Sequence, residues 1–271
     1  MPWIALPICL IISFAITANA QKLPTKQEVS IYAPATIKID GKATEWDNSF
    51  RAYNNATDIF YTLSNDDNNL YLTIQVTNPV IVNKVISGGI TFAISSQGKK
   101  NKDAVSITYP VFDKKSKPVL IVADKAKLEQ QAANREILPD SIVALNNRSF
   151  AERSKMIMVT GIKGMDTLIS VYNEDHIKVA SAFDNRMAYT YELAISLKNL
   201  GIDANGTNKF AYHIILNGDS PLTAKRATAP GGASAATTDE ISNAKLNAEL
   251  NQLGRLTAPT DFWAEYTLAK K

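Results

Sequence analysis

The fold of this chain is indicated first by residues 37–46, which read IKIDGKATEW. Apolar and polar side chains alternate over Ile37–Asp40, which is the pattern of a short strand with one buried face. The dipeptide Asp40-Gly41 predicts a tight turn, because glycine tolerates positive φ angles and aspartate bonds to its own backbone. Trp46 closes the stretch, and we expect its ring to anchor the core. Residues 37–46 therefore predict a strand, a turn and a buried aromatic side chain.

A second informative stretch, residues 61–76, reads YTLSNDDNNLYLTIQV. Strict alternation from Leu70 onward follows a polar turn, as expected for one strand of a hairpin. Similar short segments recur along the chain at 90–95, 106–111, 156–161, 167–173, 177–182, 187–197, 210–216 and 261–268. This pattern predicts an all-β protein, an antiparallel β-sandwich with one or two short peripheral helices. One helix is expected at 123–137, where good helix formers precede Pro139.

The two quoted stretches carry a resemblance to a known group of domains. The patterns I-D-G-x-x-x-E-W and N-D-x-x-N-L-Y-L-x-I-x-V resemble the start of family 9 carbohydrate-binding modules and their DOMON-like relatives. The segment YELAISLKNLG at 191–201 and the closing strand at 261–268 are similar to the same group, although Ser196 stands where proline is usual. The resemblance implies a jelly-roll-like sandwich in a secreted bacterial protein that binds a glycan without catalysing a reaction.

The N-terminus predicts export. Residues 1–20 are almost wholly apolar and end in Ala-Asn-Ala, which predicts a signal peptide cleaved after Ala20 and a secreted, periplasmic or cell-envelope location. No basic residue precedes the apolar run, so a membrane-anchoring helix is the alternative. After cleavage no membrane span is expected. We expect an extended arm at 21–34 and a single sandwich domain at 35–271, with a mobile insertion at about 221–256.

Composition and motifs argue against several classes of function. The net charge of +3 is small and dispersed, which does not favour nucleic-acid binding. The single cysteine, Cys9, lies in the predicted signal peptide, so the mature chain has neither disulfides nor a catalytic thiol. The serines lack a G-x-S-x-G context, and a glycosidase pair such as Glu192 with Glu265 or Asp184 is no better supported than other carboxylates. We therefore expect no enzymatic activity.

Period-two counting gives the candidate ligand-binding residues. If their strands share one sheet, five side chains on non-core faces line a common polar face: Trp263, Glu192, His213, Tyr71 and Gln75. Sugars are recognised by flat aromatic faces surrounded by hydrogen-bonding side chains. The resemblance implies that the sugar binds between two tryptophans. Only Trp46 and Trp263 remain after cleavage of the signal peptide, and Trp46 is expected in the core. Packing of Trp263 against a helix or the arm is the alternative.

The sequence contains ligand types for two cofactors, and neither cofactor is expected. Asp66 and Asp67 lie in an oxygen-rich loop that offers ligands for calcium, although an ordinary hairpin turn explains the same residues. Some DOMON-like domains carry a b-type haem between methionine and histidine. Residues of these types here are Met156, Met158, Met165, Met187 and His213. Single methionines on strands are usually core side chains.

The predicted function is a non-catalytic extracytoplasmic binding domain that recognises a glycan. The alternative is a structural or protein-interaction domain of the cell envelope with no small-molecule site, and a third is a haem protein for electron transfer. A glycan-binding domain is expected to expose Trp263 or Tyr71 beside Glu192 or His213. An interaction domain would bury these residues and expose an apolar patch elsewhere.

Overall fold

The computed structural model describes residues 22–47, 49–95, 104–112, 117–118, 120, 139–206, 209–218, 254 and 256–271. The predicted signal peptide at 1–20 and the predicted helix at 123–137 lie outside these residues. So does most of the predicted insertion at 221–256.

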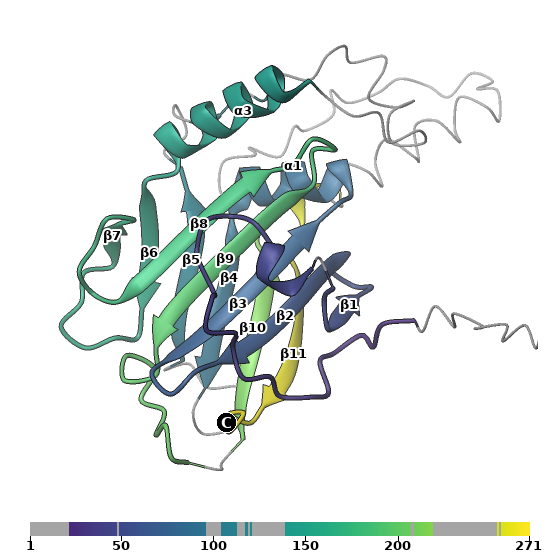
Figure 1. Cartoon of the computed structure of the whole chain (residues 1–271). Helices are drawn as coiled ribbons and strands as arrows, with labels where there is room; N and C mark the ends of the chain where they lie inside the picture. The colour runs from purple at the N-terminus through teal and green to yellow at the C-terminus, as the bar shows by residue number, and fades with distance from the viewer. Residues whose placement is uncertain are drawn as a thin grey trace, which may run out of the picture.

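The chain forms two antiparallel sheets packed face to face (Figure 1), which confirms the predicted all-β sandwich. The five-stranded sheet has the order β1-β2-β3-β9-β8. Its strands are β1 (Ala52–Asn54), β2 (Ile59–Asn65), β3 (Asn69–Val76), β9 (Tyr189–Ser196) and β8 (Ile177–Phe183). The six-stranded sheet has the order β11-β10-β4-β5-β6-β7. Its strands are β11 (Thr260–Tyr266), β10 (Phe210–Leu216), β4 (Ile90–Ser95), β5 (Val105–Val111), β6 (Met156–Thr160) and β7 (Leu168–Ser170).

One core fills the space between the two sheets, and strict alternation along the strands creates it. On β9, alternate side chains from Tyr189 to Ile195 are fully buried, and they belong to the same core cluster as Phe92 on β4 and Tyr212 on β10. Each leucine, isoleucine or phenylalanine side chain stabilises the fold by roughly 1.5–3 kcal/mol when it is fully buried. The alternation seen in the sequence therefore decides which face of each strand points inward.

Two helices are described, and neither was predicted at its observed position. Helix α1 (Pro79–Gly88) connects β3 to β4 at one end of the sandwich. The Asn78 side chain accepts a hydrogen bond from the backbone N–H of Val80 and caps the helix start. Helix α3 (Asp140–Arg153) lies against β8, where the Asn147 amide bonds to both the N–H and the C=O of Phe183. Pro139, predicted to end a helix, directly precedes this one.

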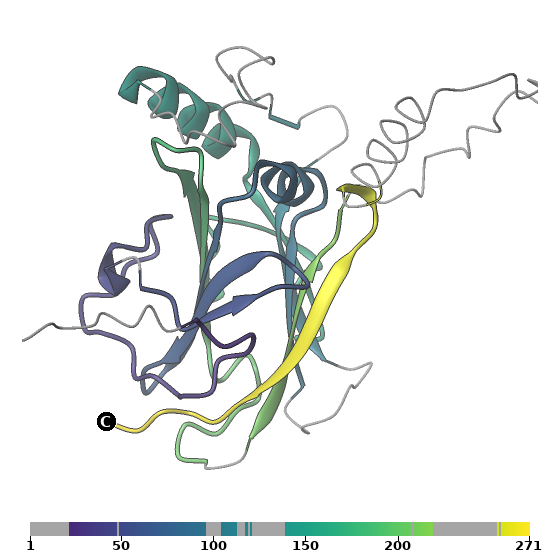
Figure 2. The same cartoon turned by 90° about the vertical axis from the view of Figure 1, so that its right-hand side faces the viewer.

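Residues 31–47, called the N-terminal cover below, lie across the outer face of the five-stranded sheet. Figure 2 views the sheets nearly edge-on and shows this purple segment beside the blue strands β2 and β3. Two small apolar clusters hold it there, one of Ala33 with Tyr71 and Ala194, and one of Ala43 with Trp46 and Phe50. The outer face beneath it is called the covered face. Trp46 is 8% exposed, so its predicted burial is confirmed, but it lies in the small cluster with Ala43 and Phe50 and not in the core between the sheets.

The predicted strand at Ile37–Asp40 is wrong, because these residues have no ladder partner. They cross the face of a sheet instead of joining its edge, so the backbone N–H groups at the end of the segment bond to a side chain. A short 3-10 helix, Thr44–Trp46, follows them.

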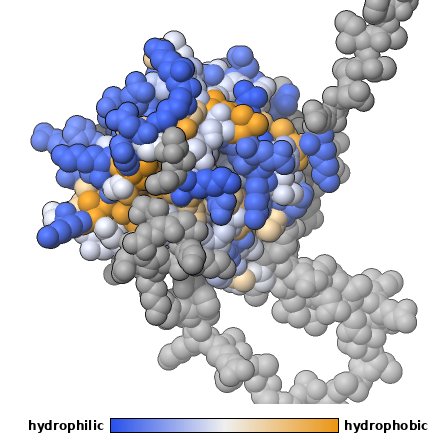
Figure 3. All heavy atoms as spheres, turned by 90° about the horizontal axis from the view of Figure 1, so that it is seen from below, coloured by the Kyte–Doolittle hydropathy of each residue, from blue (hydrophilic) through white to orange (hydrophobic). Residues whose placement is uncertain are grey.

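One end of the sandwich is seen in a space-filling view. The end seen from below in Figure 3 is mainly hydrophilic, with small separate apolar patches. Within the described part of the chain, no helix is both long and apolar enough to cross a membrane.

Candidate functional site

The five predicted ligand-binding residues divide between the two sheets. Tyr71 and Gln75 on β3 and Glu192 on β9 belong to the five-stranded sheet, whereas His213 on β10 and Trp263 on β11 belong to the six-stranded sheet. All point away from the core, as the alternation predicted, but they point from opposite sides of the sandwich. The single polar face expected from the sequence is therefore not formed.

Glu192 is fully buried under the N-terminal cover, although it was predicted to contact a ligand. Its Oε2 accepts hydrogen bonds from the backbone N–H groups of Asp40 and Gly41, each at 2.9 Å. Burial raises the pKa of the Glu192 carboxyl to about 7; the two backbone N–H groups lower it, and the carboxylates of Glu45 and Asp40 add to the rise. A fully buried carboxyl cannot meet a ligand in this conformation, so the prediction for Glu192 is corrected to a structural role.

Gly41 explains why the Asp40-Gly41 turn reaches Glu192. Its φ angle is +82°, and a Cβ at this position would lie 2.6 Å from the backbone carbon of Ser181 on β8. Only glycine allows both the left-handed conformation and this close approach to the sheet. The IDG motif therefore acts as a contact between the cover and the sheet.

Tyr71 and Gln75 also make internal contacts on the covered face. Tyr71 is 8% exposed, packs under Ala33, and donates a hydrogen bond from its hydroxyl to Asp66 Oδ2 at 2.6 Å. Gln75 is half-buried and donates from Nε2 to the hydroxyl of Thr190 at 3.4 Å. The structure thus places Tyr71 where its ring face is already packed, which does not suit a platform for a sugar.

The loop proposed for calcium is organised as a hairpin turn between β2 and β3. Asp66 Oδ1 accepts from the backbone N–H groups of Asn68 and Asn69 at 2.8 and 2.6 Å, and its other oxygen receives the Tyr71 hydroxyl. Its neighbour Asp67 is exposed. In the described residues, no group of three or more His, Cys, Asp or Glu side chains is placed to hold a metal ion.

The methionines and the histidine weighed for haem are dispersed over the fold. Met158 lies on β6 and His213 on β10, with β4 and β5 between them. Three strand spacings separate the two strands by roughly 14 Å. Met187 has its sulfur 3.6 Å from the Asn146 amide, and Met165 packs against the core.

The outer face of the six-stranded sheet carries a group of side chains that suits ligand binding better than the residues under the N-terminal cover. Trp263 and His213 are directly paired across β11 and β10, and their rings are stacked with centroids 4.1 Å apart and planes 17° apart. His213 Nε2 lies 2.6 Å from Asp261 Oδ2. The carboxylate fixes the orientation of the imidazole, and the imidazole in turn supports the indole ring.

Asp261 was missed as a candidate, although it is two residues before Trp263 and therefore on the same face of β11. Its side chain is 48% exposed, compared with 16% for His213. Glu265, two residues after Trp263, is exposed as well and lies 3.7 Å from the Lys209 ammonium. The period of two had placed Glu265 on this face with Trp263, and the same counting would have found Asp261.

The rest of this face mixes hydroxyl and amide groups with the apolar side chains of Ala93, Ala211 and Ile215. The hydroxyls of Thr91 and Thr108 are 2.7 Å apart, and Asn217 donates to Thr91 Oγ1 at 2.9 Å. The outward side chains of β4, β5, β10 and β11, with Trp263, His213 and Asp261 at one side, are called the polar face below. Among the described residues, no segment comparable to the N-terminal cover lies over it (Figure 2).

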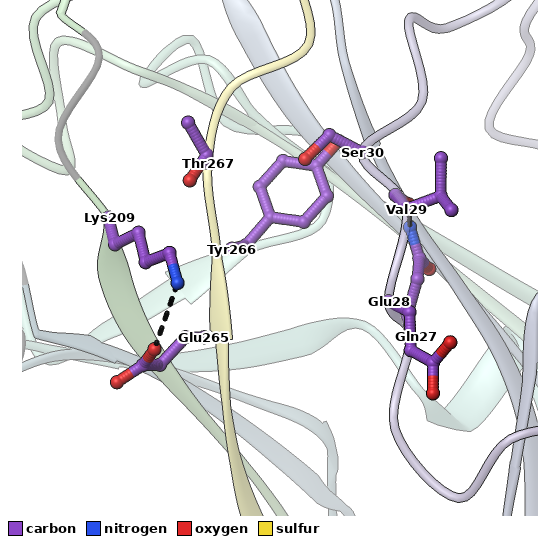
Figure 4. A pocket seen from close by; sticks show the side chains of 8 residues that line it. All are labelled: Gln27, Glu28, Val29, Ser30, Lys209, Glu265, Tyr266 and Thr267. Atoms are coloured by element: carbon purple, nitrogen blue, oxygen red, sulfur yellow. Dashed lines mark hydrogen bonds and ion pairs between the residues drawn. The ribbon is translucent and has the colours of Figure 1, made fainter.

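A small pocket lies beside the polar face, between β11 and the predicted arm (Figure 4). Its volume is about 100 Å³. Eight residues line it: Gln27, Glu28, Val29, Ser30, Lys209, Glu265, Tyr266 and Thr267. Ligand pockets for small molecules usually measure roughly 300–1,000 Å³, so this pocket does not enclose a sugar ring.

No protein-family model matches the chain, and no curated protein matches it.

Proposed function

We propose that this protein is a non-catalytic extracytoplasmic binding domain that recognises a glycan on its polar face. The observation that carries the proposal is the Trp263, His213 and Asp261 group, in which two stacked rings and one carboxylate are held together on adjacent strands. Aromatic rings provide apolar area with a defined orientation, and a carboxylate accepts hydrogen bonds from sugar hydroxyls. Strands hold such side chains more rigidly than loops do.

The neighbouring side chains support a ligand rich in hydroxyl groups. Asp261 and Glu265 offer exposed carboxylate oxygens on either side of Trp263. Thr91, Thr108 and Asn217 extend the row of neutral donors and acceptors across the sheet. A face of this composition suits a neutral polar ligand laid across several strands.

The carboxyl with the raised pKa lies away from the polar face. Glu192, with its pKa raised to about 7, has the protonation behaviour of a general acid or base. It is fully buried on the opposite side of the sandwich from Trp263, so it cannot act on a ligand bound at the polar face.

An alternative function is favoured by one specific observation on the same sheet. Met158 and Leu168, directly paired across β6 and β7, are 40% and 50% exposed. Contiguous exposed apolar patches mark protein-interaction sites. The alternative is therefore a protein-interaction domain of the cell envelope that binds through β6 and β7.

A glycan array on residues 21–271 separates these proposals. The unmodified protein is expected to bind at least one glycan, and Trp263→Ala is expected to weaken that binding at least tenfold, a loss of about 1.4 kcal/mol. Tyr172→Ala is the matched control, because Tyr172 is an aromatic residue, 77% exposed, outside the site, and its removal is expected to leave binding unchanged.

Two outcomes would contradict the glycan proposal in different ways. An array without any hit argues against glycan binding as a function. A hit that survives Trp263→Ala moves the site away from the polar face. Capture of a defined envelope protein that Met158→Asp abolishes would instead support the protein-interaction alternative.

A further inference from the structure

The N-terminal cover is attached to the covered face by three sets of hydrogen bonds. Asp40 and Gly41 donate from their backbone to Glu192 Oε2. Trp46 donates from Nε1 to the Thr73 hydroxyl at 3.2 Å. Near the start of the cover, the Asn65 backbone bonds to Ile31 and Ala33, at 3.1 and 2.7 Å. Of the side chains that accept these bonds, only Glu192 can change its charge.

The Glu192 carboxyl also lacks a hydrogen-bond partner for one of its two oxygens. Both backbone donors reach the same oxygen, Oε2, while Oε1 is buried without a hydrogen-bond partner. No ion pair to Glu192 forms among the described residues. A buried ionised carboxylate is costly unless both of its oxygens are satisfied, whereas a neutral carboxyl with one unsatisfied group costs much less.

We propose that Glu192 forms a pH-dependent contact with the N-terminal cover: the neutral carboxyl holds the cover on the sheet, and the ionised carboxylate weakens that attachment. This inference does not rest on the proposed glycan site, which lies on the other side of the sandwich. Opening of the cover would uncover Tyr71 and Ala194 on the sheet and would separate Trp46, which belongs to the cover, from Phe60 on β2.

The titratable groups around Glu192 also favour its neutral form. From the cover, the carboxylates of Glu45 and Asp40 raise its pKa further, after the larger effect of burial. The phenol of Tyr71 on β3 is engaged by Asp66. The lysines on the surrounding elements are exposed to solvent: Lys38 and Lys42 on the cover and Lys178 on β8. Attraction from these exposed lysines is screened and does not offset the burial of the carboxyl.

Hydrogen exchange followed by mass spectrometry tests the proposal on the full chain. Protection of peptides from residues 31–47 is compared at pH 5.5 and 8.5 after correction for intrinsic exchange, with peptides from β10 as the internal reference. A carboxyl with a pKa of about 7 when covered and 4.5 when open predicts protection on the order of 30-fold lower at pH 8.5.

Two variants isolate the carboxyl responsible. Glu192→Gln keeps an oxygen that accepts both backbone N–H groups but cannot ionise, so the pH dependence in residues 31–47 is expected to disappear. Glu265→Gln, a matched exposed glutamate on the other sheet, is expected to behave like the unmodified protein.

The proposal is overturned if Glu192→Gln retains the pH dependence of the cover, or if Glu265→Gln removes it. The unmodified protein decides the question even if Glu192→Gln does not fold. Equal corrected protection of residues 31–47 at both pH values would show that the attachment does not respond to Glu192.

Discussion

Both outer faces of the sandwich carry polar and aromatic side chains, but these side chains make different contacts on the two faces. On the covered face, Thr73 and Glu192 bond to the N-terminal cover and Tyr71 packs against it. On the polar face, His213, Trp263 and Asp261 bond to one another, and Asp261 stays exposed. A polar side chain facing outward from a strand is therefore not by itself a sign of a ligand site. What lies over the strand decides whether that side chain holds the fold together or meets a ligand.

The largest expected effect comes from the two tryptophans, one on each face. Trp46→Ala is expected to lower the free energy of unfolding by roughly 3–5 kcal/mol, because it leaves a cavity under the cover. Trp263→Ala, on the polar face, is expected to cost about 1 kcal/mol. Urea unfolding monitored by circular dichroism measures both values. Equal costs for the two substitutions would remove the distinction between the faces.

A smaller effect is expected from the glycine that lets the cover approach the sheet. Gly41→Ala is expected to cost roughly 2–4 kcal/mol, because a left-handed residue gains a Cβ that collides with the β8 backbone. Gly164 is the matched control, since its φ angle is +80° and a Cβ there would meet nothing within 4 Å. Gly164→Ala therefore reports the conformational cost alone, about 1–2 kcal/mol. If both substitutions cost the same in thermal unfolding, the close packing of the turn on β8 is disproved.

The smallest expected effect concerns pH. The pKa of Glu192 is raised in the folded state to about 7 from 4.5, so its stabilising contribution is complete below pH 4.5 and is lost as the pH rises through 7. Between pH 5.5 and 8.5 the unmodified protein is expected to lose about 2 kcal/mol relative to Glu192→Gln. Urea titrations of the two proteins at both pH values measure this difference. If the free energies of unfolding of the two proteins differ by the same amount at pH 5.5 and 8.5, the prediction is contradicted.

The strands were predictable from sequence because their burial has a short period. The segments predicted at 90–95 and 210–216 coincide with β4 and β10, and the alternation on β9 places its apolar side chains in the core. Helix α1 was missed because its many β-branched residues suggest a strand. Its start was nevertheless visible in Asn78-Pro79, a capping residue followed by proline at the first helical position.

The candidate site was only partly predictable, since sequence periodicity gives the face of a strand but not its sheet. Strand β3 pairs with β9 and β10 pairs with β11, which are contacts between distant parts of the chain. For this reason Trp263 and His213 were correctly placed on a non-core face, while Glu192 was grouped with them across the sandwich. The burial of Glu192 depends on the N-terminal cover. The IDG motif contacts Glu192 from this cover, but its sequence was interpreted as a strand and a turn.

The most direct test of the covered face is a carbon-13 NMR titration of the Glu192 side-chain carboxyl in the folded protein, assigned by comparison with Glu192→Gln. A carboxyl buried under the N-terminal cover is expected to titrate with a midpoint near pH 7, and the amide signals of Asp40 and Gly41 are expected to shift with the same midpoint. A midpoint near 4.5, the ordinary glutamate value, with no linked shift at Asp40 and Gly41, would show that Glu192 is open to water and that the cover does not close this face.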